Sequence, residues 1–199
     1  MVFLRELKCI FIHIPKTAGT SIEQFLKDNN KNELEYLGVR NNRSLQHLTA
    51  LELSKEIPYV FKIYYKFSFV RNPYDRLLSV YYWTPIPNVG YKYGKTKAEF
   101  LNFVTNLIKN KRFFNNVYVD HFAPQYLFLY GNRKLLVDEV FKYEKLEESV
   151  KYLKEKFGIN NELPILNKSK TKKEDWNERQ KERIYKLYMT DFIIFGYSK

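Results

Sequence analysis

Apolar residues follow strand-like and helix-like patterns in turn along this chain. Cys9–Ile14 is a short apolar run that ends at Pro15, which is typical of a buried strand. Ile22, Phe25 and Leu26 then recur at the spacing of one helix face. We therefore predict a buried strand that passes through a tight loop directly into a helix.

The same arrangement is predicted a second time further along the chain. Tyr64–Val70 is rich in aromatic and β-branched residues, which favours a second core strand. Asn72 is suited to cap a helix and Pro73 to occupy its first position, while Leu77 and Leu78 begin its buried face. Two strand–loop–helix units are therefore expected.

Weaker patterns predict further elements, and no repeat or low-complexity linker separates them. We therefore expect one domain over residues 1–199. The expected elements are a strand at Glu35–Val39, a helix capped by Thr49 with Glu52, an amphipathic helix at Ala98–Ile108, strands at Tyr126–Tyr130 and Val140–Tyr143, a helix that Gly158 ends, and a last helix capped by Asp175 with Glu178.

The composition is that of a folded, strongly basic protein. Hydrophobic residues make up 45% of the chain and aromatic residues 18%, which argues against an intrinsically disordered chain. Lysine and arginine number 34 against 22 acidic residues, so the formal net charge is +12. This charge favours an anionic ligand or partner, and a nucleic acid, an anionic lipid surface, an acidic glycan and a nucleotide all fit it.

The positions of cysteine and histidine bear on disulfide formation, cellular location and metal binding. Cys9 is the single cysteine, so no internal disulfide can form and we expect a reducing, cytoplasmic location. The N-terminal segment M-V-F-L-R-E-L-K is interrupted by charges and predicts neither a signal peptide nor a membrane span. His13, His47 and His121 are far apart in the sequence, so the pattern predicts no metal site.

The loop after the first predicted strand, P-K-T-A-G-T-S, combines groups that bind phosphate. Gly19 permits a tight turn or close approach to a ligand, and the helix that follows presents free N–H groups and the positive end of its dipole. Lys16 adds a cation. Hydroxyl groups come from Thr17, Thr20 and Ser21. Because Lys16 precedes the loop's only glycine, the NTPase signature is not met. The alternative is an ordinary turn with a solvated lysine.

The second loop follows the strand in F-S-F-V-R-N-P-Y-D-R-L-L-S. Arg71 offers a planar fork for phosphate oxygens, and the hydroxyl of Ser79 lies two helical turns further on. The alternative is that Arg71 pairs with Asp75 and that Ser79 is merely a small helix residue. We assign Arg76 to structure, with Asp75 or a nearby carboxylate as its partner.

These two loops resemble the phosphate-binding segments of sulfotransferases that use 3'-phosphoadenosine 5'-phosphosulfate (PAPS). The first resembles the 5'-phosphosulfate loop. The second resembles the segment in which an arginine and a serine, here Arg71 and Ser79, reach the 3'-phosphate. Further resemblance to the carbohydrate sulfotransferase family, which includes heparan sulfate 2-O, chondroitin and dermatan enzymes, extends over H-L-T-A-L-E-L, D-H-F-A-P-Q, F-K-Y-E-K-L, L-P-I-L-N-K-S and D-F-I-I-F-G-Y.

The resemblance implies an α/β fold with a P-loop-kinase-like parallel sheet flanked by helices. It also implies transfer of a sulfuryl group from PAPS to a carbohydrate hydroxyl, with 3'-phosphoadenosine 5'-phosphate (PAP) as product and no metal. Lys16 is then the group for the leaving oxygen. The backbone N–H groups that assist it belong to Thr17, Ala18, Gly19, Thr20 and Ser21.

A general base is also implied, because the acceptor hydroxyl must lose a proton near neutral pH. In the resembling enzymes the base lies between the two phosphate segments, which points to His47. His121 and a carboxylate are the alternatives, and His13 is assigned to structure because it lies on the buried strand. The single histidine of this motif departs from the paired histidines of the heparan 2-O enzymes, which leaves the acceptor class open.

Two further groups of residues have weaker assignments. Lys168, Ser169 and Lys170 match a segment that closes over the nucleotide, with a solvated basic loop as the alternative. Trp83, Tyr91 and Tyr93 are candidate platforms for sugar rings, with ordinary packing as the alternative.

Three rival functions fit part of the sequence. A nucleotide kinase would have the fold that we expect for this chain, and a basic polyanion-binding module would have a similar net charge. A PAPS binder without turnover would have the same two phosphate loops. No nucleic-acid motif is present, so we expect no nucleic-acid partner. The resemblance implies a glycan or another hydroxyl-bearing acceptor as partner. Neither the acceptor nor the oligomeric state can be deduced from the sequence.

Overall fold

The computed structural model describes residues 2–27, 38–41, 43–83, 96–111, 113–114, 118–164 and 175–199. Several predictions made from the sequence fall outside these residues. They concern most of the strand at Glu35–Val39, the aromatic residues Tyr91 and Tyr93, and the basic segment Lys168, Ser169 and Lys170.

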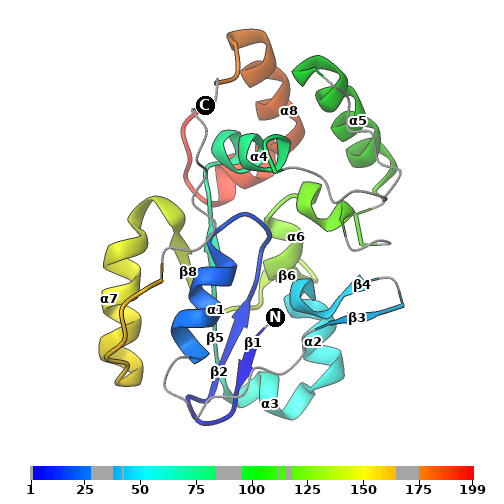
Figure 1. Cartoon of the computed structure of the whole chain (residues 1–199). Helices are drawn as coiled ribbons and strands as arrows, with labels where there is room; N and C mark the ends of the chain where they lie inside the picture. Colours follow the sequence, from blue (N-terminus) through cyan, green and yellow to red (C-terminus); the bar gives the residue numbers. More distant parts are fainter. Residues whose placement is uncertain are drawn as a thin grey trace.

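A four-stranded sheet in the order β1-β2-β5-β8 forms the centre of the fold (Figure 1). Strands β2 (Cys9–Ile12), β5 (Tyr65–Val70) and β8 (Glu139–Lys142) are parallel, and β1 (Val2–Leu4) pairs with β2 in the antiparallel direction. Phe67 of β5 lies opposite Phe11 on one side and Glu139 on the other. The predicted parallel α/β fold is confirmed.

Side-chain alternation along the strands divides the apolar residues between the two faces of the sheet. Cys9 and Phe11 pack in a cluster with α1 (Gly19–Lys27) and α7 (Leu146–Phe157). Ile10 and Ile12 belong to a cluster on the other face, which is covered by the helices α2 (Ala50–Glu56), α3 (Pro58–Ile63) and α6 (Tyr126–Leu129) (Figure 1). Both faces are therefore covered by helices, as parallel strands require.

A third apolar cluster lies beyond the carboxyl ends of the parallel strands. It joins α4 (Pro73–Tyr81), α5 (Lys97–Asn110) and α8 (Glu178–Ile194), which gather at the top of Figure 1. Among the described residues, no helix has the length and apolar character needed to span a bilayer. The smaller elements are β3 (Val39–Arg40), β4 (Arg43–Ser44), β6 (Tyr130–Gly131), β7 (Lys134–Leu135) and the 3-10 helices η1 (Leu45–His47), η2 (Val119–Phe122) and η3 (Tyr143–Lys145).

Several helix ends agree with the predictions from local sequence. Thr49 and Glu52 form both bonds of a capping box at α2, and the side chain of Asn72 accepts from the Tyr74 N–H at the start of α4. Gly158 ends α7 in the left-handed conformation, with φ of 66°. These signals act within three residues of one another, so they are readable from the sequence.

One predicted strand and the predicted start of one helix were wrong. The segment predicted as a strand at Tyr126–Tyr130 is mainly helix α6, because both carboxylate oxygens of Asp191 accept from the N–H groups of Gln125 and Tyr126, at 2.7 and 2.9 Å. A carboxylate from α8 thus satisfies donors at the start of this short helix.

The last helix also begins later than predicted. Its capping box consists of Asn177 and Gln180, in place of Asp175 with Glu178. The carboxylate of Asp175 accepts from the Trp176 N–H. Both pairs have the spacing of a capping box, so spacing alone did not distinguish them.

Candidate active site

The predicted phosphate loop connects β2 to α1 and has an unusual backbone. Lys16 and Ala18 have φ of 70° and 68°, in the left-handed region that residues with a Cβ rarely occupy. The Thr17 hydroxyl donates to the Ile14 carbonyl at 2.8 Å and holds the loop closed. Such conformations cost about 1–3 kcal/mol each and concentrate at functional sites, and left-handed residues help to turn successive N–H groups toward an anion.

Gly19 begins α1 directly against the ring of His13. A Cβ on this residue would overlap the imidazole at Nε2. Close approach is therefore the reason for this glycine, but the group that it approaches in the structure is His13, whereas close approach to a ligand was one of the expectations. The remaining hydroxyl residues differ in exposure, since Thr20 is exposed and Ser21 is buried.

Arg71 lies where β5 ends and is held through its backbone by Gln125. The Arg71 N–H donates to Gln125 Oε1, and Gln125 Nε2 donates to the Arg71 carbonyl, both at 2.8 Å. The guanidinium lies 4.2 Å from the centre of the Tyr143 ring, and its Nη1 lies 3.5 Å from the Lys16 carbonyl oxygen. Its buried Nε has no hydrogen-bond partner among the described residues. The predicted phosphate arginine therefore retains an unsatisfied donor next to the first loop.

Arg76 fastens three segments together. Its Nε donates to the Pro15 carbonyl at 3.0 Å, Nη1 to the Ala123 carbonyl at 3.0 Å and Nη2 to the His121 carbonyl at 3.1 Å. The assignment to structure agrees with these contacts, but the expected carboxylate partner was wrong, because all three of these hydrogen bonds go to backbone carbonyl oxygens. Ser79 lies one turn later on α4 and is half-buried.

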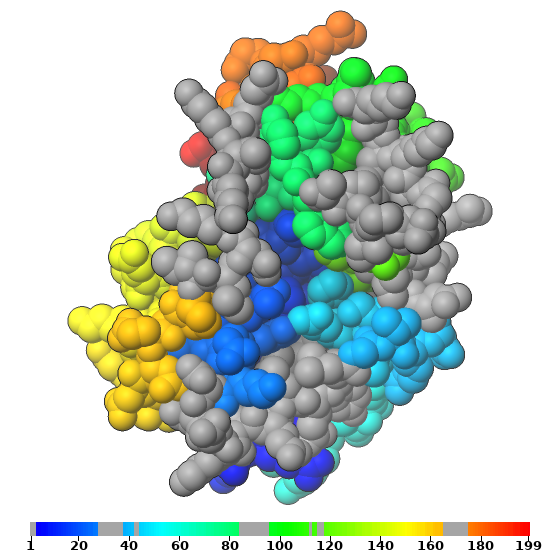
Figure 2. Space-filling view, viewed as in Figure 1, coloured from blue at the N-terminus to red at the C-terminus, as the bar shows by residue number. Residues whose placement is uncertain are grey.

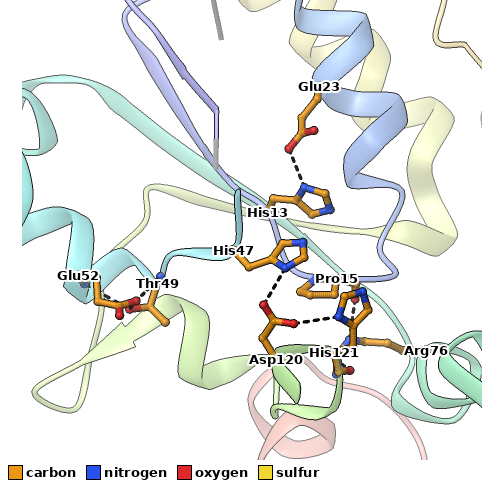
Figure 3. Close-up of polar contacts among 9 residues, drawn as sticks. All are labelled: His13, Pro15, Glu23, His47, Thr49, Glu52, Arg76, Asp120 and His121. Carbon is orange, nitrogen blue, oxygen red and sulfur yellow. Dashed lines mark hydrogen bonds and ion pairs between the residues drawn. The ribbon is translucent and has the colours of Figure 1, made fainter. Parts of the chain in front are cut away.

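The three histidines, which the sequence keeps far apart, meet in the fold (Figure 3). The ring centres of His13 and His47 are 5.0 Å apart, and those of His47 and His121 are 5.3 Å apart. Asp120 lies between the last two, with Oδ2 2.8 Å from His47 Nδ1 and Oδ1 2.9 Å from His121 Nδ1. His47 itself ends the 3-10 helix η1.

This cluster is also relevant to metal binding. The possible ligand atoms of His47, Asp120 and His121 all lie within 4.8 Å of one another, so the reasoning that sequence separation excludes a metal group was wrong. Two imidazoles and a carboxylate could hold a transition-metal ion. In the structure, each Nδ1 is already hydrogen-bonded to the carboxylate.

Burial and hydrogen bonding determine the charges of the cluster. Burial would raise the pKa of Asp120, but the hydrogen bonds from His121 and His47 lower it to about 2. Burial lowers the pKa of His121 to about 4 despite the adjacent carboxylate, and lowers the pKa of His13 to about 4 despite its 2.6 Å bond to Glu23. At neutral pH, Asp120 is therefore ionised, and the rings of His13 and His121 are neutral.

Trp83 connects this cluster to the phosphate loop. Its ring stacks on His121 with centres 4.4 Å apart and an interplanar angle of 6°, and the Lys16 ammonium lies 5.1 Å from the Trp83 ring centre. Figure 2 shows the blue segment that carries this loop between the yellow segment of α7 and the cyan segment around α2. Lys16, Trp83 and His121 thus form a continuous series of contacts.

Asp120 is the site residue that the sequence analysis missed. It directly precedes His121 in V-D-H-F, and an acidic neighbour of a candidate base is a signal that could have identified it. Its bond to His47 spans 73 positions and could not be deduced from local pattern.

Comparison with known proteins shows the family of this chain. Residues 1–198 match the Sulfotransferase family. Carbohydrate sulfotransferase 11 of Mus musculus and that of Rattus norvegicus are each 24% identical over 237 aligned positions, which include the whole chain and 67% of the relative. No solved structure matches. The chain belongs to the sulfotransferase family.

Proposed function

We propose that the protein transfers a sulfuryl group from PAPS to a hydroxyl of a carbohydrate. The observation that carries the proposal is the contact between the two predicted phosphate loops, in which Arg71 Nη1 lies 3.5 Å from the Lys16 carbonyl. This contact supports a single site between the two loops. Family membership supplies the reaction class, and the names of the curated relatives supply the carbohydrate acceptor.

The donor would be bound at both of its ends. Lys16 and the backbone N–H groups from Thr17 to Ser21 would hold the 5'-phosphosulfate, where a helix N-terminus favours negative charge. Arg71 would bind the 3'-phosphate, and its unsatisfied Nε supports this role. Ser79, and Lys168, Ser169 and Lys170, remain proposed contacts on the basis of the resemblance.

The transfer would proceed in line. As the bond between sulfur and the bridging oxygen breaks, negative charge builds up on the leaving phosphate, and the Lys16 ammonium would stabilise it. His47 would accept the proton of the acceptor hydroxyl. Its position supports this role, because it is buried next to His121, which the stacked Trp83 ring joins to Lys16.

Calorimetry of nucleotide binding tests the donor assignment. We expect PAP to bind without magnesium, and expect Lys16→Ala and Arg71→Ala each to weaken binding. Lys27→Ala is the matched control, because Lys27 is an exposed lysine at the far end of α1. A preference for magnesium-ATP would indicate a nucleotide kinase. Salt-dependent DNA binding that survives Arg71→Ala would indicate a polyanion-binding module.

A transfer assay tests whether the protein turns over PAPS. We expect labelled PAPS to transfer its sulfuryl group to at least one member of a glycan panel, with Lys16→Ala as the blank. Binding of PAP without transfer to any glycan in the panel would favour a PAPS binder without turnover.

A further inference from the structure

We infer that Asp120 is a positioning residue that couples His47 and His121 into one proton-accepting unit and holds the Nε2 atom of each ring free. The inference rests on the proposed function, because the acceptor hydroxyl of that reaction supplies the proton that the unit accepts. The arrangement of the three side chains can be tested without any substrate.

The hydrogen bonds of Asp120 determine the tautomers of both rings. An ionised carboxylate can only accept, so His47 Nδ1 and His121 Nδ1 must both donate, at 2.8 and 2.9 Å (Figure 3). A neutral imidazole carries one proton, so Nε2 of a neutral ring is then the lone-pair atom. The carboxylate thus selects Nε2 as the basic atom of each ring, as in other base–orienter pairs.

The second histidine keeps the transferred proton off the carboxylate. Two N–H donors stabilise the ionised form of Asp120, whose pKa is about 2. A proton accepted by His47 would therefore stay on the ring, and the imidazolium formed would lie against a buried anion that offsets its charge. The His121 N–H donates to Asp120 throughout, and this bond weakens the attraction between the carboxylate and the transferred proton.

The groups around His47 and His121 hold the unit in place. The His13 ring lies edge-on to His47 and is neutral at pH 7, because burial lowers its pKa to about 4. Its partner Glu23 also accepts a hydrogen bond from Gln46, the residue before His47. On the other side, the His121 carbonyl accepts from Arg76, whose positive charge also stabilises Asp120.

Lys16 provides the charge at the opposite end of the unit. Its ammonium lowers the pKa of His121, after the larger effects of burial, Asp120 and His47. A positive group therefore lies beside His121, and a ring that is neutral at pH 7 lies beside His47. This asymmetry agrees with the assignment of His47 as base.

Bonds, proton and electron pair are all accounted for in the proposed transfer step. The acceptor O–H bond breaks, its proton passes to His47 Nε2, and the oxygen forms a bond to sulfur. The bond between sulfur and the 5'-phosphate oxygen breaks, and its electron pair leaves with PAP beside Lys16. Asp120 gains no proton, and its hydrogen bond to the His47 ring strengthens as that ring becomes charged.

Nitrogen NMR of histidine-labelled protein tests the tautomers directly. The chain has only 3 histidines, so His13→Gln, His47→Gln and His121→Gln suffice to assign the spectrum. In the neutral form of each ring we expect an unprotonated Nε2 and a protonated Nδ1 for both His47 and His121. Protonated Nε2 and unprotonated Nδ1 on either ring would overturn the inference. This measurement uses the unaltered protein and no PAPS, so it is independent of whether the proposed transfer occurs.

Kinetics test the coupling, with opposite pH shifts for two variants. Asp120→Asn should lower kcat by about 100-fold or more with unchanged binding of PAP, and should move the acid limb of kcat/KM to lower pH, because the ring loses its anion. His121→Phe keeps a ring to stack on Trp83 but removes one donor to Asp120. It should move the same limb to higher pH and lower kcat less than His47→Gln does.

Three outcomes would contradict the inference. These are an unchanged pH profile in Asp120→Asn, a loss of kcat in His121→Phe as large as in His47→Gln, and activity that a chelator abolishes and zinc restores. The last would make these side chains metal ligands. By contrast, failure of the wild-type protein to bind PAP would contradict the proposed function and leave the tautomer measurement standing.

Discussion

Arg76 on α4 donates a hydrogen bond to the carbonyl oxygen of Pro15, 61 positions earlier, at 3.0 Å. The same guanidinium binds the carbonyls of His121 and Ala123, so one buried cation joins the phosphate loop to the segment that carries Asp120. The relative position of the two halves of the site therefore depends on this side chain.

Replacement of Arg76 by methionine should destabilise the fold. It would leave three buried carbonyl groups without donors, each at a cost of about 1–3 kcal/mol, so we expect the free energy of unfolding to fall by about 3 kcal/mol or more. Urea denaturation measures the loss. Arg179→Met, at an exposed position of α8, is the control and should change stability little. Equal stability of the two variants would contradict the fastening role.

Gly19→Ala should destabilise the fold for a specific steric reason. Its Cβ would overlap the His13 ring, and we expect a loss of about 1–3 kcal/mol, the usual cost of overpacking. The double variant with His13→Ala should lose less than the sum of the two single losses, because the alanine opens the space. Additive losses in urea denaturation would show that the contact is not the cause. Ala18→Gly is a useful comparison, since it removes the strained Cβ at φ of 68°.

Arg71→Lys should show that the planar fork matters beyond its charge. Lysine keeps the cation but loses the guanidinium face against Tyr143 and the unsatisfied Nε. We expect the Kd for PAP to rise about 10- to 100-fold, equivalent to one charge-assisted hydrogen bond. Calorimetry measures the change, and an unchanged Kd would remove Arg71 from the phosphate site. Tyr143→Phe retains the ring and serves as the control.

Acidification should destabilise the protein between about pH 6.5 and 4. Burial lowers the pKa of His13 and of His121 from 6.5 to about 4, so each ring takes up a proton on unfolding in this range, and its stabilising contribution, present above pH 6.5, is lost as the pH falls. Burial raises the pKa of Asp191 from 3.8 to about 6, which has the opposite effect. Two histidines against one carboxyl leave a net loss with falling pH.

We expect the free energy of unfolding to be lower by about 2 kcal/mol at pH 5 than at pH 7, as the linkage of these three groups requires. Urea denaturation at both values measures it. In His121→Phe the difference should nearly vanish, because one histidine and one carboxyl then oppose each other. A wild-type protein that is more stable at pH 5 would show that the histidines are not neutral in the folded state.

Much of the fold was predictable because its signals are local. The β2 and β5 runs, the Thr49 capping box, the Asn72 cap and the Gly158 helix end each depend on residues within a few positions of one another. The strand–loop–helix order of both predicted phosphate loops was also readable from the sequence. Where a distant group intervened, prediction failed. Helix α6 replaced a strand because Asp191 of α8 satisfies its first N–H groups.

The residues of the site also divide into those that local sequence places and those that only long-range contacts place. Sequence order is sufficient to place Lys16 and Arg71 at strand ends, because a strand that runs into a helix carries its loop residues to the edge of the sheet. Sequence order could not show that His47 and His121 share Asp120, since the bond between His47 and Asp120 joins residues 73 positions apart. Such a contact exists only after the sheet, the helices and Arg76 have brought separate segments together, so the charges and tautomers of the site are properties of the folded chain.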